Sequence, residues 1–341
     1  MISDNFLMKR LMQILCIIFI SIILYGCENS KTVPVLTSKD FHKGTSALEM
    51  EFIKGIMPDA VYENSMFLIG INIKNNGAEN IKKGLLNLGI ERDYINLKKE
   101  ELKTNLGDGI EIVNENTLRF NLSGKNIYNP LGQQGFIYLS AETNELAKQS
   151  QTLISNIALT ACYDYKTVSV STICIDTDIT NTDIRDKNCI VKELSLDSQG
   201  APVAVTKIEY QMLPSGPNYV KPEFFITIEN KGSGEVVSPE ENIIKSLCGL
   251  GSLPKPESDI GFDEKKRQLV FNVVELSASL SIGFDELLRC EPYEDDYYRG
   301  VIKLKDGIGI AKCTLEGGID VSKGSYTTPL RIQLDYGYTF S

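Results

Sequence analysis

Residues 71–77 read INIKNNG and residues 226–232 read ITIENKG. In the first stretch, apolar side chains alternate with other residues from Phe67 onward, and the pattern ends at Asn-Asn-Gly. A period of two is typical of a half-buried β-strand, and Asn-Gly is typical of a tight turn. We therefore expect a strand before each turn, with Ile71, Ile73, Ile226 and Ile228 facing a core.

The two stretches belong to a longer unit that occurs twice, 155 positions apart at residues 71 and 226. Leu48 and Met50 correspond in the same way to Val203 and Val205. Each copy also closes alike, with LTACYDY at 159–165 and IQLDYGY at 332–338. The units therefore run from about 48 to 165 and from about 203 to 338, and each is long enough to bury its own core.

Most of the remaining sequence also favours strands. Alternating or β-branched runs occupy residues 117–122, 136–139, 157–174, 268–274 and 301–304. Asp306-Gly307 predicts a hairpin between 301–304 and 308–311. Helical spacing is confined to residues 93–103 and to a segment that begins at Ser238 and runs through Lys245. Many short strands separated by turns predict an all-β sandwich in each unit, with the two units forming separate sheets.

The paired motifs resemble a known class of module. Alternating strands that end in Asn-x-Gly, followed by a closing Tyr-x-Tyr strand, are similar to the immunoglobulin-like adhesion modules of prokaryotic, especially archaeal, cell-surface proteins. The resemblance implies two tandem immunoglobulin-like β-sandwiches at residues 47–175 and 201–341, joined by a linker at 176–200. It also implies a protein that binds or spaces and does not catalyse.

The N-terminus is typical of an export signal. Lys9 and Arg10 precede an apolar run at 11–24, and Leu24-Tyr25-Gly26-Cys27 resembles the lipobox of prokaryotic lipoproteins, although Tyr25 is larger than usual there. Residues 1–26 are thus expected to be a signal peptide, Cys27 the lipidated residue, and residues 27–46 a polar tether. An uncleaved anchor and plain secretion remain as alternatives.

Six further cysteines lie in this exported chain, which favours disulfides. Cys174 and Cys189 flank a polar loop, and Cys290 and Cys313 bracket the Asp306-Gly307 hairpin, so we expect each of these two pairs to be bonded. Cys162 and Cys248 are left, one in each unit. They either bridge the units or both stay reduced in the cores.

The sequence contains few candidates for chemistry. Asp176, Asp178 and Asp183 have oxygen ligands suited to calcium, but they lack the glycine and glutamate of an EF-hand and fit a solvated loop equally well. Residues 291–298 mix acidic side chains with tyrosines, as recognition loops do, and as exposed loops also do. The only histidine is His42, which argues against most zinc sites and against histidine-based catalysis.

The length, composition and net charge of the chain are also typical of a globular protein with few candidates for chemistry. The chain has 341 residues, of which 42% are hydrophobic, so it can bury a core, and its net charge of −10 argues against nucleic acid as a partner. We expect a membrane-anchored, extracytoplasmic cell-surface protein that binds a protein or glycan ligand in a structural or adhesive role, with no cofactor. The alternative is an accessory subunit of a secretion, pilus or transport assembly.

Overall fold

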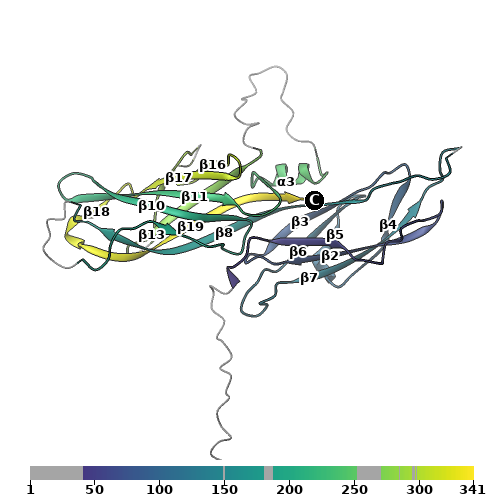
Figure 1. Ribbon diagram of the computed structural model, residues 1–341, viewed down its shortest axis with the longest axis horizontal. Coiled ribbons are helices and arrows are strands. Elements are labelled where there is room, and N and C mark those ends of the chain that lie inside the picture. The colour runs from purple at the N-terminus through teal and green to yellow at the C-terminus, as the bar shows by residue number, and fades with distance from the viewer. Residues whose placement is uncertain are drawn as a thin grey trace, which may run out of the picture. The chain divides into compact units, whose positions relative to one another are not determined.

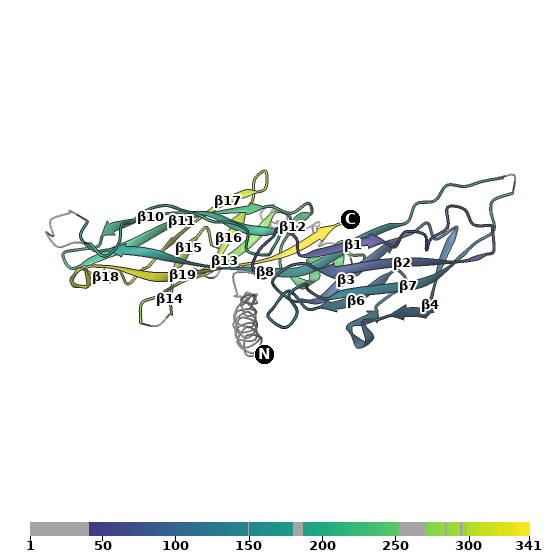
Figure 2. The ribbon, with the colours of Figure 1, turned by 60° about the horizontal axis from the view of Figure 1, so that its bottom comes forward.

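A computed structural model describes residues 41–341, except for residues 149, 180–186, 252–269, 284, 294–295 and 297 and the side chain of residue 99. This part of the chain consists mainly of β-strands, with one α-helix and two short 3-10 helices (Figures 1 and 2). The expectation of an all-β chain is therefore confirmed. Among the described residues, no helix combines the length and the apolar character that a membrane crossing requires.

The first repeat contributes a four-stranded antiparallel sheet in the order β1-β2-β7-β4. Its strands are β1 Leu48–Phe52, β2 Met66–Asn75, β4 Ile95–Thr104 and β7 Gln134–Thr143. The INIKNNG motif ends β2, and Ile71 and Ile73 are completely buried, as the alternation predicts. Asn72, between them, is half-buried on the other face.

The second repeat contributes a corresponding sheet in the order β15-β17-β11-β10-β9, with β18 paired to β11. Its strands are β9 Leu194–Ser195, β10 Val203–Pro214, β11 Tyr219–Asn230, β15 Arg289–Glu291, β17 Ile308–Thr314 and β18 Ile319–Asp320. Ile226 and Ile228 of β11 are buried as completely as their counterparts in β2.

The third sheet takes strands from both repeats, in the order β14-β13-β19-β8-β3-β6-β5, with β12 on β19 and β16 on β13. The first repeat supplies β3 Ile81–Gly89, β5 Ile110–Ile112, β6 Thr117–Leu122 and β8 Ala158–Asp176. The second repeat supplies β12 Glu235–Val237, β13 Val273–Ser281, β14 Asp285–Leu287, β16 Gly300–Lys303 and β19 Ser325–Phe340.

This shared sheet shows that the expectation of two separate sandwiches is wrong. The cause is the length of β8 and β19, which have 19 and 16 residues. The first residues of β8 pair with β3, and the strand then continues alongside β19 as far as Asp176. The last part of β8 therefore lies against the second repeat, and the strand ends at Asp176. Buried side chains of both repeats form one continuous core.

The two repeats are related by a local twofold arrangement near the start of the β8–β19 pairing, which begins at Ala161 and Phe340. Tyr163 lies opposite Tyr338 and Tyr165 lies opposite Tyr336, so each closing strand faces its own copy in reverse. Leu159, Ala161 and Tyr163 of β8 point into the core, as expected. Ile332, Leu334 and Tyr336 of β19 do the same, which confirms the predicted parity of the closing strands.

One of the two helix predictions is wrong and the other is confirmed. Residues 95–103 of this segment lie in β4, because pairing with β7 overrides the helical spacing of Tyr94, Leu97 and Leu102. The register between Lys98 and Lys103 is interrupted by a bulge at this sheet edge. The second predicted helix is present as α3, Glu241–Leu247.

The Asp306-Gly307 turn is present, but it does not join two strands of one sheet. Both residues have positive φ, at 52° and 79°, as a two-residue turn of this type requires. Lys305 and Ile308 form a single β-bridge on either side of the turn. Beyond it, β16 pairs with β13 while β17 pairs with β11, so the chain passes from one sheet to the other.

Candidate functional site

A recess on the outer face of the shared sheet collects the charged side chains that form the best candidate site. Residues of β8 alternate between the core and this face, so Cys162 and Asp164 point away from Tyr163 and the core. α3 packs over this face and contacts β8 (Figure 1). A small second core forms beneath the helix from Leu85, Cys162, Val237, Ile244 and Cys248.

A disulfide between Cys162 and Cys248 attaches the end of α3 to β8. Of the two alternatives for these cysteines, the structure therefore has the bridge between the repeats. Cys248 follows α3 directly, and the backbone carbonyl of Cys248 accepts a hydrogen bond from Thr117 Oγ1 at 3.3 Å. The bond and the apolar cluster around it hold α3 over strands of the first repeat.

The recess beside this disulfide has a volume of about 380 Å³. Residues from β3, β6, β8 and α3 line it, together with the segment before the helix: Lys82, Lys83, Leu85, Arg119, Asp164, Pro239, Glu241, Ile244 and Lys245. Four of these side chains are cationic and two are anionic. This balance is opposite to that of the whole chain, whose net charge is −10.

A bulge in β3 displays Lys82 and Lys83. Ile81 pairs with Leu122 and Gly84 pairs with Phe120, so the two lysines lie in an irregular segment between regular pairs. Lys83 has a positive φ of 57°, and its backbone N–H donates to Asn121 Oδ1 at 2.8 Å. Both lysine side chains are exposed. Gly84 is needed beside them, because a Cβ there would lie 2.5 Å from the Phe120 ring.

The cationic side chains of the recess differ in whether they form an ion pair with a carboxylate. Arg119 forms an ion pair with Glu111 at 2.6 Å, and Lys245 forms one with Glu241 at 2.7 Å. Within the described part of the chain, Lys82 and Lys83 form no ion pair closer than 4.0 Å. Their ammonium groups therefore act on Asp164 and, from Lys83, on Glu241 without a direct ion pair.

Asp164 is one of the two anionic residues that line the recess, and it is exposed. Partial removal of water by the surrounding protein raises the pKa of its carboxyl, and this outweighs the lowering by Lys83 and Lys82. Positive charge near this carboxyl stabilises its ionised form, whereas an anion close to it destabilises that form. A bound anion is accordingly expected at the lysine rim and not beside Asp164.

The two tyrosine pairs fix the strands that carry the recess. Tyr165 Oη accepts from the Glu79 N–H at 3.0 Å and donates to the Glu79 carbonyl at 3.2 Å. Tyr338 Oη accepts from the Gly234 N–H at 2.7 Å, in the equivalent turn of the second repeat. Gly77 and Gly232 have no side chain at the point where these hydroxyls approach, and a Cβ at either position would overlap the hydroxyl.

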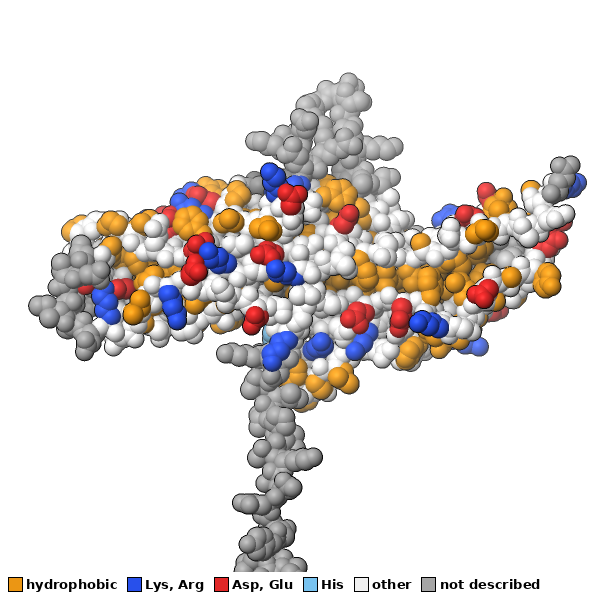
Figure 3. Space-filling view, in the orientation of Figure 1, with side chains coloured by type: hydrophobic (Ala, Val, Ile, Leu, Met, Phe, Trp, Pro, Cys, Tyr) orange, Lys and Arg blue, Asp and Glu red, His pale blue; other side chains and the backbone are white. Residues whose placement is uncertain are grey.

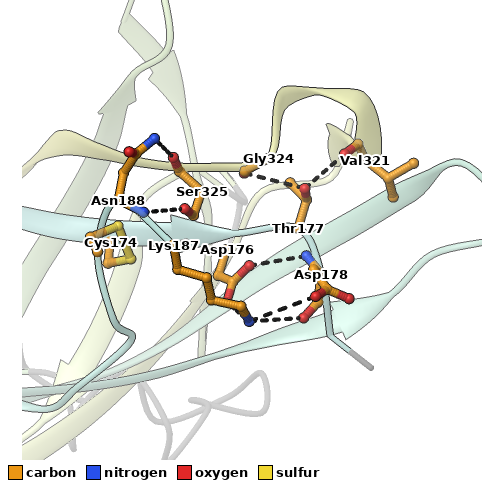
Figure 4. A network of polar contacts seen from close by, with 10 residues as sticks. Cys174, Asp176, Thr177, Asp178, Lys187, Asn188, Val321, Gly324 and Ser325 are labelled. Atoms are coloured by element: carbon orange, nitrogen blue, oxygen red, sulfur yellow. Dashed lines mark hydrogen bonds and ion pairs between the residues drawn. A yellow bond between two sulfur atoms is a disulfide. The ribbon is translucent and has the colours of Figure 1, made fainter. Parts of the chain in front are cut away.

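The structure contains the two disulfides that cysteine spacing predicts, Cys174–Cys189 and Cys290–Cys313. Cys290 and Cys313 lie on the neighbouring strands β15 and β17, directly opposite each other. Cys174 is near the end of β8, and its bridge holds residue 189 against this strand (Figure 4). A second recess of about 510 Å³ lies beside that bridge, with Tyr210 and Lys192 in its lining.

The predicted calcium ligands are placed differently from a metal cage. Lys187 Nζ donates to Asp176 Oδ2 at 2.6 Å and to the Asp178 carbonyl at 3.4 Å, and it lies 3.9 Å from Asp178 Oδ2 (Figure 4). An ammonium group thus occupies the position between the two carboxylates. Asp183 lies outside the described residues. Across the described ranges, no three His, Cys, Asp or Glu side chains come close enough to hold a metal ion.

Two other predicted features, the lipidated Cys27 and the tyrosine-rich segment 291–298, lie wholly or partly outside the described residues. Cys27 lies outside the described residues. In the tyrosine-rich segment, Tyr293 folds back on Arg289, whose guanidinium carbon lies 5.2 Å from the ring centre and whose Nη2 donates to the Tyr293 hydroxyl at 3.2 Å. Tyr298 is 42% exposed and points to solvent more than Tyr293 does.

The recess itself is not predicted by any pattern in the sequence. Lys82, Lys83, Arg119 and Lys245 are spread over more than 160 positions, and only the fold brings them together. One local signal was present, because the adjacent Lys82-Lys83 pair interrupts an otherwise alternating strand in an acidic chain. No family model matches the chain, and no curated protein matches it.

Proposed function

We propose that this protein is held at the outside of a membrane by a lipid on Cys27 and presents a binding surface there, in a structural or adhesive role. In this proposal the two repeats are immunoglobulin-like units that share one sheet. Three disulfides fit an oxidising compartment outside the cytoplasm. The short apolar run before Cys27 and the basic pair Lys9-Arg10 fit export.

The observation that carries a binding role is the cationic recess beside α3. Its volume of about 380 Å³ falls in the range of ligand sites. Its two lysines without a direct ion pair among the described residues favour an anionic group, because opposite charge favours both encounter and register. The ligand class is therefore a glycan or protein that carries carboxylate, sulfate or phosphate groups.

Binding is tested with one polymer in two charge states, dextran and dextran sulfate, against the purified full-length protein. We expect the sulfated polymer to bind and the neutral one not to bind. The double variant Lys82→Gln/Lys83→Gln should weaken binding at least tenfold. The matched control is Lys305→Gln/Lys323→Gln, which removes two exposed lysines elsewhere. Equal losses in the two double variants would show that net charge, and not the recess, determines binding.

The anchor is tested separately by Cys27→Ser. The variant should leave the membrane fraction, or should accumulate as an uncleaved precursor, because only cysteine carries the diacyl group. The measurement is cell fractionation combined with intact mass of the recovered protein. A Cys27→Ser protein of mature size that stays in the membrane fraction would exclude the lipid as the tether.

A second candidate function is that of an accessory subunit in an envelope assembly. Ile308 and Ile310 on β17 are 48% and 59% exposed, and they lie on the same face of the strand. Neighbouring apolar side chains on an outer sheet face favour a protein contact. A photo-crosslinking residue at position 310 should then give one discrete high-mass adduct in cells, and the absence of any adduct would remove this candidate.

A further inference from the structure

The loop between β6 and β7 exposes three large apolar side chains within five residues. Ile127 is 61% exposed, Tyr128 is 95% exposed and Leu131 is 73% exposed. Single exposed apolar residues are common on protein surfaces, but such a group on one loop is typical of an interaction site. In Figure 3 hydrophobic side chains project at the lower edge of the molecule, where Figure 1 draws this loop before β7.

Hydrogen bonds within the loop give it a defined conformation. Asn126 Oδ1 accepts from the backbone N–H groups of Tyr128 and Asn129 at 2.9 Å and 3.0 Å. The backbone N–H of Asn126 donates to the Asn129 carbonyl at 3.0 Å, and Gln133 N–H donates to the Ser123 carbonyl at the same distance. The three apolar side chains are therefore held outward by an ordered turn and do not fold back onto the sheet.

The loop lies near the point where the described chain begins (Figure 1). The Lys125 N–H donates to the Gly77 carbonyl at 2.8 Å. Ala78, which follows Gly77, donates its N–H to the Gly200 carbonyl at the same distance. Gly200 in turn packs against the backbone of Phe41 and His42. The base of the loop is thus separated from Phe41 by only two backbone segments.

The charge of the surrounding sequence also distinguishes this loop. No Asp or Glu occurs from Thr117 to Ala141, in a chain that contains 45 acidic residues. Lys125 at the base of the loop is partly buried, which lowers its pKa, and the charge of nearby Lys74 lowers it further. An apolar tip above basic groups, without acidic ones in the segment, suits the headgroup region of an anionic bilayer.

We infer that Ile127, Tyr128 and Leu131 insert into the interface of the membrane that carries the lipid on Cys27. This inference rests on the proposed lipid anchor. Fourteen residues, the length of 27–40, would span roughly 20 Å in a random coil and at most about 50 Å when fully extended. A tether of this length keeps Phe41, and the loop near it, close to the bilayer. Tyr128 is suited to the interface because its ring is apolar and its hydroxyl remains hydrated.

The chain contains no tryptophan, so one introduced tryptophan reports on a single position. The test uses the full-length lipidated protein as the variant Tyr128→Trp. The matched control is Tyr62→Trp, because Tyr62 is 88% exposed and precedes β2 at the end opposite Asn75. Both variants are reconstituted in vesicles of phosphatidylcholine and phosphatidylglycerol at 3:1, with and without brominated acyl chains.

We expect bromine to quench the tryptophan emission of the Tyr128→Trp variant at least twofold and to leave that of the Tyr62→Trp variant unchanged. Vesicle flotation is measured on the same samples. Flotation of the Tyr128→Trp variant without quenching overturns the insertion of the loop and leaves the anchor intact. Failure to float overturns the anchor, and the loop inference with it. If emission of the Tyr128→Trp variant stays unquenched in vesicles, but shifts to shorter wavelength with an envelope extract, the loop is assigned to a protein partner and the inference is also overturned.

Discussion

At the scale of single residues, the hydroxyl groups of Tyr165 and Tyr338 connect the closing strands β8 and β19 to the segments that follow the Asn-x-Gly turns. Replacing Tyr165 with Phe leaves the N–H of Glu79 without its acceptor, because the hydroxyl is the group that reaches this turn. Leaving a buried polar group unpaired costs about 1–3 kcal/mol. We expect Tyr165→Phe and Tyr338→Phe each to lower the free energy of unfolding in urea by that amount. Tyr128→Phe, at an exposed position, should change it by less than about 0.5 kcal/mol.

A second residue-scale prediction concerns acid stability. A hydrogen bond from Lys312 lowers the pKa of the Glu223 carboxyl, with a smaller contribution from Gln211. Because this pKa is lower in the folded chain than in the unfolded chain, the pair stabilises the fold above about pH 4.5, and the stabilisation disappears as the pH falls through the folded-state pKa. Glu223→Gln should therefore be less stable than the parent by up to about 1 kcal/mol at pH 7, and equal to it at pH 2. A difference that persists unchanged at pH 2 would contradict this assignment.

At the scale of elements, the disulfides differ most in the length of chain that they close. Cys162 and Cys248 are 86 positions apart, whereas Cys174 and Cys189 are 15 apart. Restricting the unfolded chain stabilises the fold by about 4–5 kcal/mol for the longer loop and about 3 kcal/mol for the shorter one. Cys162→Ala/Cys248→Ala should accordingly lower the free energy of unfolding more than Cys174→Ala/Cys189→Ala.

The same variants separate the stability of the recess from that of the fold. Loss of the Cys162–Cys248 bond frees the C-terminal end of α3. This helix carries two residues of the recess, Glu241 and Lys245. Hydrogen exchange of α3 should therefore become faster in this variant at a denaturant concentration where the sheet remains folded. Unchanged protection of α3 would show that Val237 and Ile244 alone hold the helix in place. Both comparisons assume that the disulfides are formed in the parent protein. Titration of free thiols in the native parent checks this assumption.

At the scale of the whole molecule, the shared sheet predicts that both repeats unfold together. β8 and β19 each contribute to the core of both halves, so neither repeat retains a complete sheet when the other unfolds. Tryptophans introduced singly in the two repeats, as Tyr62→Trp and Tyr219→Trp, should report the same thermal midpoint. Two midpoints separated by more than a few degrees would restore the reading of independent units.

Local pattern was sufficient to predict much of the fold. Ile71, Ile73, Ile226 and Ile228 are buried as the alternation indicates, because side-chain direction in a strand depends only on parity. The Asp306-Gly307 turn follows from the tolerance of these two residues for positive φ. In the Asn-x-Gly segments, the Asn75 and Asn230 side chains accept hydrogen bonds from the N–H groups of Gly77 and Gly232. The pairs Cys174–Cys189 and Cys290–Cys313 were accessible because few residues separate their members.

Tertiary structure alone decided how these strands combine. Pairing between β8 and β19 joins residues more than 140 positions apart, and nothing in either strand's alternation states which edge it will meet. Residues 93–103 became a strand because β7 offered an edge, which outweighed their helical spacing. The cationic recess also needed the fold, since its four cations come from three separate elements. Parity and turn chemistry are local properties of the chain, whereas sheet order and the assembly of a site depend on contacts between distant segments.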